Sequence, residues 1–146
     1  MLKPDNIYCG NCIELMEEIE DHTVDMVLCD LPYGITNNSW DKKLNYDELW
    51  NAYGRILKTD RSPVVLFGGG LFAHELVMSK PKWFRYEWIW EKPNAVGFLN
   101  ANRRPLSAHE MILVFAKKSP KYYPVKELGY KPYVRKMHAP SENYNS

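Results

Sequence analysis

The chain has 146 residues, of which 45% are hydrophobic, 14% aromatic and 25% charged, and its formal net charge is +1. This composition excludes a disordered or low-complexity chain and predicts one globular domain over residues 1–146. The sequence contains neither an apolar run of the roughly 18 residues that a membrane span needs nor a signal-peptide pattern, so we expect no membrane contact and a cytoplasmic location.

Apolar spacing predicts alternating helices and strands along most of the chain. Helices are expected over 13–20, 46–57 and 71–78, and strands over 24–29, 63–67, 84–91 and 111–116. Two strand-helix-strand passages, 24–67 and 64–90, predict an α/β fold with a mostly parallel sheet and right-handed crossovers.

The first predicted strand ends in the segment Asp30-Leu31-Pro32-Tyr33. Ligands of open α/β sheets bind just beyond the carboxyl ends of strands, so Asp30 is expected in a crevice. Pro32 favours an extended Leu31, which gives the Leu31 carbonyl a defined direction. The Asp30 carboxylate and this carbonyl could accept the two hydrogens of an exocyclic amino group, while Tyr33 supplies an aromatic ring. An ordinary Asp-x-Pro turn is the alternative interpretation.

The chain from Ile7 to Tyr133 resembles the DNA amino-methyltransferases, whose signature is (D/N/S)-P-P-(Y/F). The resemblance is nearest to the adenine-specific β class, and Leu31 departs from it because it replaces the first proline. Other segments follow the family's order, among them Trp40-Asp41-Lys42, the run from Trp88 to Lys92 and the run from His109 to Phe115.

This resemblance implies a Rossmann-like class I methyltransferase sheet, S-adenosylmethionine as cofactor and double-stranded DNA as partner, with the target adenine flipped out of the helix. It also implies catalytic roles for Asp30, Leu31, Pro32 and Tyr33, and cofactor contacts for Asn11 and Asp30. The family often has an acidic residue where this chain has Asn11. A cognate restriction endonuclease, a homodimer and a phage or mobile-element origin are further expectations from the resemblance.

One part of the family pattern is missing before Ser146. The cofactor loop F-x-G-x-G follows the catalytic motif in this class, and the run Phe67-Gly68-Gly69-Gly70 lacks that spacing, so we interpret it as a tight turn at the rim of the sheet. We therefore expect the strands of the cofactor half to be lacking and the strand 26–29 to form an edge. The explanations are a longer protein, which we favour, a second chain, or a decayed remnant; the 146 residues alone need not be active.

Charge is unevenly distributed along the chain. Residues 1–91 contain 9 Lys or Arg against 15 Asp or Glu, whereas residues 92–146 contain 10 against 3. We expect DNA contacts from the loop 94–109 and from the basic tail 117–146, which would lead toward a target-recognition region. The candidate contact residues are Asn100, Asn102, Arg103, Arg104, Lys117 and Lys118. A solvated basic surface is the alternative.

Three functions compete at this point. The first is a DNA adenine methyltransferase, the second a methyltransferase acting on RNA or on a protein amide, and the third a non-catalytic DNA-binding remnant. Cys9 and Cys12 have the spacing of half a zinc site, but the sequence has no second cysteine pair and no closely spaced histidine pair. No metal is therefore expected.

Overall fold

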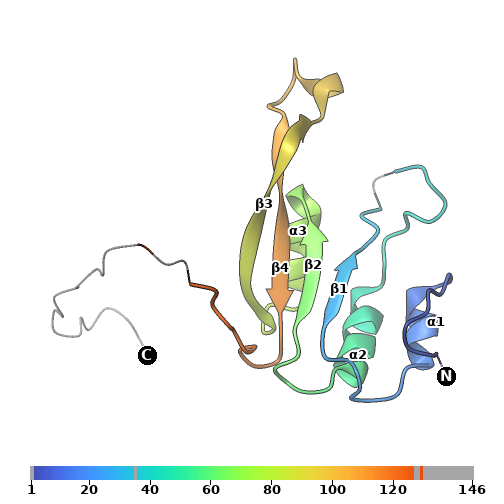
Figure 1. The fold of residues 1–146 in the computed structure, drawn as a ribbon. Helices are drawn as coiled ribbons and strands as arrows, with labels where there is room; N and C mark the ends of the chain where they lie inside the picture. Colours follow the sequence, from blue (N-terminus) through green and yellow to red (C-terminus); the bar gives the residue numbers. More distant parts are fainter. Residues whose placement is uncertain (1, 35, 127–128, 130–146) are drawn as a thin grey trace.

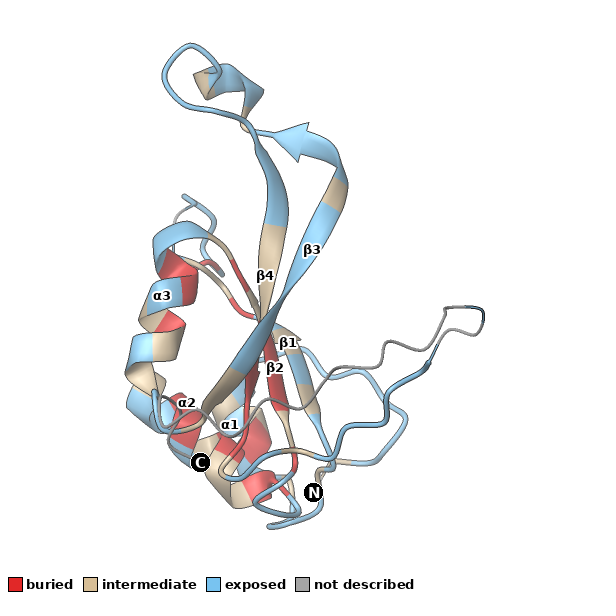
Figure 2. Ribbon diagram, turned by 90° about the vertical axis from the view of Figure 1, so that its left-hand side faces the viewer, coloured by how far each residue is buried: buried red, intermediate tan, exposed pale blue. Residues whose placement is uncertain are grey.

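The computed structural model describes residues 2–34, 36–126 and 129, which form a mixed α/β sheet with helices packed on one face (Figure 1, Figure 2). The elements are α1 (Cys12–Glu17), β1 (Val27–Asp30), α2 (Tyr46–Ile56), β2 (Val64–Gly68), α3 (Gly70–Ser79), β3 (Phe84–Val96), the 3-10 helix η1 (Phe98–Asn100) and β4 (Ser107–Phe115). Every predicted helix and strand is present. Within the described ranges, no helix has the length and apolar character to cross a membrane.

Local capping explains where the first two helices begin. The Asn11 side chain caps α1 by accepting a hydrogen bond from the Ile13 amide, and Asn45 caps α2 by accepting one from the Asp47 amide. Asparagine at this position satisfies amides that have no partner inside the helix. The apolar stripe of α2 then buries four side chains against the sheet, namely Leu49, Trp50, Tyr53 and Ile56.

The strand order in the described part of the chain is β1-β2-β4-β3, and β4 corrects the predicted topology. β1 pairs with β2 in parallel, whereas β4 pairs antiparallel with both β2 and β3. β3 therefore runs in the same direction as β1 and β2, as the strand-helix-strand passages predict, but it does not pair with β2. The sheet is mixed rather than mostly parallel because β4 returns from β3 through a hairpin, which is too short for a crossover helix.

Strand alternation gives the sheet one buried face and one open face. Leu66 and Leu113 are register partners on the helix side and join the core with α2 and α3. On the other face, the Leu28, Trp88 and Trp90 side chains remain about half exposed. β1 lies at the edge of the sheet in the described chain, as predicted from the sequence.

The segment 94–109, predicted as a loop, forms the tip of a long hairpin, and the strands extend into it at both ends. β3 continues to Val96 and β4 begins at Ser107, so the irregular part is residues 97–106. The register shifts between Glu91 and Val96, next to Pro93. Proline lacks an amide donor and ordinarily ends a strand, so the sequence predicted a strand that stops before Pro93. The register shift accommodates the proline, and the strand continues. The hairpin projects beyond the rest of the sheet at the end where β1 and β2 finish (Figure 1).

The glycine run forms the tight turn that its sequence predicts. Gly68 ends β2, Gly69 caps α3 in an extended conformation with φ −142°, and Gly70 begins the helix with φ +54°. A Cβ atom on Gly68 would lie 3.2 Å from the backbone of Ala73. The chain can therefore pass from the central strand to α3 within two residues.

Gly70→Ala is expected to lower the free energy of unfolding by about 1 kcal/mol, because a Cβ atom is disfavoured at positive φ. Gly69→Ala is the matched control, since this neighbour has ordinary extended geometry and open space around its Cα. Urea denaturation of both variants measures the difference. Equal stability of the two would contradict the left-handed conformation at position 70.

Candidate functional site

Asp30, the first residue of the motif, is the last residue of β1 and is exposed at the rim of the sheet. It is the register partner of Phe67 near the end of β2. The next side chain, Leu31, is buried in the core with only 4% of its surface exposed. This burial gives a reason for leucine at the position where the signature has proline, because the side chain contributes apolar contacts to the core.

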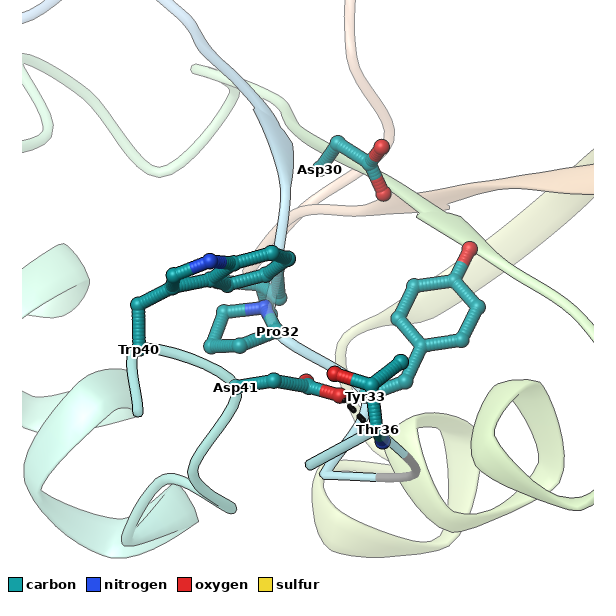
Figure 3. Close-up of a pocket in the computed structure, with 7 residues that line it drawn as sticks. Asp30, Pro32, Tyr33, Thr36, Trp40 and Asp41 are labelled. Atoms are coloured by element: carbon teal, nitrogen blue, oxygen red, sulfur yellow. Dashed lines mark hydrogen bonds between the residues drawn. The ribbon is translucent and has the colours of Figure 1, made fainter. Parts of the chain in front are cut away.

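A cavity of about 350 Å³ lies beside the motif (Figure 3). Trp40, whose side chain is 69% exposed, and Tyr33 stand on opposite sides of it, with Pro32 between them and Asp30 at one end. Its lining residues are Asp30, Leu31, Pro32, Tyr33, Thr36, Trp40 and Asp41. The lining therefore combines aromatic surfaces with carboxylates and contains no cationic side chain from the described residues.

The loop after the motif is held by the buried carboxylate of Asp41, which is 6% exposed. Its Oδ1 accepts a hydrogen bond from the Gly34 amide, and its Oδ2 accepts one from the Thr36 amide, both at 2.6 Å. Gly34 has φ +68°, a conformation that favours glycine. Charge-assisted hydrogen bonds of this kind are stronger than neutral ones. Asp41 thus fixes the backbone immediately after Tyr33.

Tyr33 is held on one ring face and at its hydroxyl. The ring stacks on Phe72 of α3, with centroids 4.3 Å apart and an interplanar angle of 19°. The hydroxyl is directed toward Asp30 (Figure 3). Burial, followed by the charges of Asp30 and Glu110, raises the pKa of Tyr33 to about 12, so the phenol keeps its proton and can donate to the carboxylate.

The Asp30 carboxyl has a pKa above its ordinary value. Desolvation is the main cause, and the negative charge of Glu110 acts in the same direction. The positive charge of Lys92 and the hydrogen bond from Tyr33 oppose this rise. Three different segments, β3, β4 and the motif itself, therefore determine the charge of Asp30.

A second cavity, of about 560 Å³, lies between Tyr33 and the projecting hairpin. Its lining includes the glycine turn, Phe72 and Met111 on the helix side. The hairpin and its strands contribute charged and polar side chains, namely Lys92, Arg104, Ser107, His109 and Glu110. Tyr33 lines both cavities, so the motif stands between an apolar, acidic space and a space with cationic groups at its boundary.

The two residues predicted to contact the cofactor, Asp30 and Asn11, have different surroundings in the structure. Asp30 lines the first cavity, but Asn11 lines neither cavity and instead caps α1, where its amide nitrogen also donates to Glu14. α1 nevertheless packs against the same core as β1, through Ile13 and Met16 of the helix and Cys29 of the strand. Burial is the main cause of the raised pKa of the Cys29 thiol. Within the described residues, no group of three or more histidine, cysteine or carboxylate side chains is placed to hold a metal ion.

The predicted DNA-contacting residues fall at two ends of the sheet. Asn100, Asn102, Arg103 and Arg104 lie at the hairpin tip, on the same side as the motif. Lys117 and Lys118 follow β4 at the opposite end, where Lys118 pairs with Asp60 at 2.9 Å. Of these six residues only Arg104 lines the second cavity, and its three neighbours at the tip lie on the same side of the molecule. Most of the basic tail, residues 127–128 and 130–146, lies outside the described residues.

Five further residues of the site were not assigned from the sequence: Thr36, Trp40, Asp41, Lys92 and Glu110. A Trp-Asp pair in a polar loop shows neither periodicity nor metal-ligand spacing, so nothing in the pattern itself indicates a site. Gly34 just after the motif is a signal that could have indicated Asp41. A glycine there predicts a left-handed turn, and the amides of such a turn need an acceptor nearby. Lys92 and Glu110 are 18 positions apart in sequence and come together through the hairpin register.

Comparisons with known proteins identify relatives of this chain. A family model described as DNA methylase matches residues 24–144. The type II methyltransferase M2.MboI of Moraxella bovis is 29% identical over 113 residues, covering 61% of this chain and 41% of that protein. The chain thus spans less than half the length of this curated relative.

Two solved structures share the fold. The PvuII DNA methyltransferase, which is cytosine-N4-specific, aligns with a TM-score of 0.58 and 17% identity over 78% of this chain and 50% of the other. The M1.HpyAVI complex with SAM aligns with a TM-score of 0.60 and 19% identity over 85% of this chain and 62% of the other. Since the family model covers most of the residues, the chain belongs to the DNA methylase family that modifies exocyclic amino groups at N6 or N4.

Proposed function

We propose that this chain provides the base-binding and amino-orienting part of a methyltransferase that transfers a methyl group from S-adenosylmethionine to the N6 amino group of adenine in DNA. Adenine is chosen over cytosine because the motif and its place early in the chain resemble the adenine-specific β class. The chain spans only part of the length of its relatives, so we propose the complete activity for the whole protein.

The observation that carries the proposal is that Asp30 lines the first cavity next to Tyr33, the motif residue that lines both cavities. The Asp30 carboxylate lies at the end of a strand, beside an aromatic ring that is fixed by Phe72. The larger cavity adjoins the hairpin with its arginines, so a base displaced from a duplex could enter from that side. An amino group cannot be reached inside the base stack, and extruding the base costs a few kcal/mol.

Asp30 acts as an acceptor in this mechanism. Its carboxylate and the Leu31 carbonyl accept the two amino hydrogens, which turns the nitrogen lone pair toward the methyl donor. The base amine is too weak an acid to be ionised first, so the help from Asp30 grows as positive charge develops on nitrogen. The nitrogen gains the methyl group and releases one proton to Asp30 or to solvent. Tyr33 orients the carboxylate through its hydroxyl.

The lining of the smaller cavity suits part of the methyl donor, because it combines carboxylates with an aromatic ring. S-adenosylmethionine supplies an electrophilic methyl group on a cationic sulfonium when it is bound. Asp30 gives a favourable electrostatic environment for a cation, and the exposed Trp40 ring offers a surface for a purine or for the sulfonium itself. We propose that these two residues hold the donor on this side of Tyr33.

The hairpin tip is the proposed contact with DNA. Arg103 and Arg104 are exposed beside η1, together with Asn100 and Asn102. Arginine neutralises phosphates or reads guanine edges, and asparagine suits adenine edges. Double-stranded DNA is therefore the expected partner of this end of the molecule.

Asp30→Ala is expected to reduce methyl transfer to duplex DNA by at least about 100-fold, because the amino group loses its charged acceptor. Transfer of labelled methyl groups by the complete protein measures the loss, and nucleoside analysis distinguishes N6-methyladenine from N4-methylcytosine. Asp25→Asn is the control, since this exposed carboxylate pairs only at the surface with Lys58 in the described structure.

Each result of this assay decides between functions. N4-methylcytosine as the product would overturn the adenine assignment but keep the family chemistry. Transfer to RNA or to protein with none to DNA would overturn the DNA assignment. Salt-sensitive DNA binding by an unmodified protein that transfers no methyl group would identify a non-catalytic remnant.

Asp41→Asn is expected to reduce methyl transfer by about tenfold or more and to lower the free energy of unfolding by roughly 1.5–3 kcal/mol. An amide can accept through only one of its two ends, so either the Gly34 or the Thr36 amide loses its partner. Methyl transfer at saturating DNA and thermal unfolding measure the two effects. An unchanged rate in a destabilised variant would mean that the loop does not position the motif.

Replacing Arg103 and Arg104 by alanine is expected to weaken DNA binding and to lower the slope of log affinity against log salt by about one for each phosphate that is no longer neutralised. Lys118→Ala is the matched comparison, because this lysine lies at the opposite end of the sheet and pairs with Asp60. An equal effect of Lys118→Ala would instead place the DNA along both ends of the sheet.

A further inference from the structure

An ion pair next to the motif has no role in the proposed transfer. Lys92 of β3 and Glu110 of β4 form a salt bridge with a short contact, and their side chains are only 22% and 26% exposed. The Lys92 ammonium also lies 5.8 Å from the centre of the Trp90 ring. Partial burial of both charges makes this pair different from the other ion pairs of the described chain, which are more exposed.

The sheet register places this pair on the same face as Asp30. Asp30 is the partner of Phe67, Phe67 is the partner of Ile112, and Glu110 precedes Ile112 by two residues on β4. Residues two apart on a strand share a face, so Asp30, Phe67 and Glu110 lie on one side of the rim. The Phe67 and Trp90 rings are in edge contact with centroids 5.8 Å apart. This contact links β2, whose Phe67 is the register partner of Asp30, to the strand that carries Lys92.

From this arrangement we infer that Lys92 and Glu110 are positioning residues that control the charge of the Asp30 carboxylate during methyl transfer. The inference rests on the proposed function, because it assigns the pair a role toward the same acceptor. Glu110 holds the ammonium beside the motif, and the ammonium counteracts both the desolvation of Asp30 and the negative charge of Glu110. The two members therefore act in opposite directions on the carboxylate.

Other titratable groups lie beside the Asp30 carboxyl or face the larger cavity with the ion pair. The Tyr33 hydroxyl is directed toward it, and the Cys29 thiol precedes it on β1. Arg104 and His109 from the hairpin face the larger cavity together with the pair. Among them, Tyr33 lowers the pKa of Asp30 through its hydrogen bond, whereas Lys92 and Glu110 act through charge and with opposite sign. This opposition makes the inference testable by exchanging one charge at a time.

The direction of each effect follows from the charge that remains. Lys92→Met leaves Glu110 alone beside Asp30, which raises the pKa of the Asp30 carboxyl further above its ordinary value. Glu110→Gln leaves Lys92 alone, which lowers it. Because transfer needs the ionised carboxylate, activity is lost as pH falls through the pKa of Asp30. The acid limb of the rate profile therefore moves to higher pH in Lys92→Met and to lower pH in Glu110→Gln.

The experiment measures the rate of methyl transfer to duplex DNA against pH with the complete protein. On the acid limb, Lys92→Met is expected to be about tenfold slower than the unmodified protein, while rates on the neutral plateau agree within about twofold. The double variant Lys92→Met/Glu110→Gln is expected to return the limb toward its original position, and Lys92→Arg to leave it in place. Lys58→Met, which breaks the exposed pair with Asp25, is the matched control.

A second measurement separates this inference from the proposed function. Carbon-13 labelling of aspartate carboxyls, with Asp30→Asn used to assign the signal, follows the titration of Asp30 without DNA or methyl donor. The inference is supported if the titration midpoint of Asp30 is highest in Lys92→Met, intermediate in the unmodified protein and lowest in Glu110→Gln. This result supports it even if the protein transfers no methyl group. Equal titration midpoints in the three proteins, or a uniform loss of rate at every pH in Lys92→Met, would overturn the inference. The ion pair would then only stabilise the hairpin.

Discussion

The register of β2 is the constraint on which the site depends. β2 pairs with β1 on one side and with β4 on the other, so a single strand determines the height of Asp30 relative to Glu110. Its helix-side residues, Val64 and Leu66, are completely buried against α2 and α3, which prevents the strand from sliding. A shift by one residue would bring its buried side chains to the open face, so the apolar core fixes the geometry of the rim.

Helices and buried strands were predictable because their signals are local. The bounds of α2 follow from its asparagine cap and apolar stripe, and β2 follows from a short apolar run before glycines. The direction of β4 was not predictable, because a strand that is apolar on both faces carries no information about its partner. Pro93 concealed the extension of β3 for a different reason, since a proline ordinarily ends a strand unless an irregularity accommodates it.

The candidate site was predictable only where its residues are consecutive. Asp30 to Tyr33 form a motif that can be recognised in the sequence, whereas Trp40 and Asp41 join it through a loop whose closure depends on backbone amides. Lys117 and Lys118 were predicted as DNA contacts from the basic composition of residues 92–146. Composition carries no information about position, and β4 carries these lysines along its whole length to the far end of the sheet.

The placement of the tryptophans has an optical consequence. The Trp50 indole is buried, donates its N–H to Ser79 and contacts Phe115, so its fluorescence reports on the integrity of the core. The Trp40 indole stands in solvent at the wall of the smaller cavity, where a bound aromatic molecule would quench or shift its emission. A difference spectrum against Trp40→Phe isolates this second signal from the half-exposed indoles of β3. The chain therefore contains separate intrinsic reporters of folding and of site occupancy.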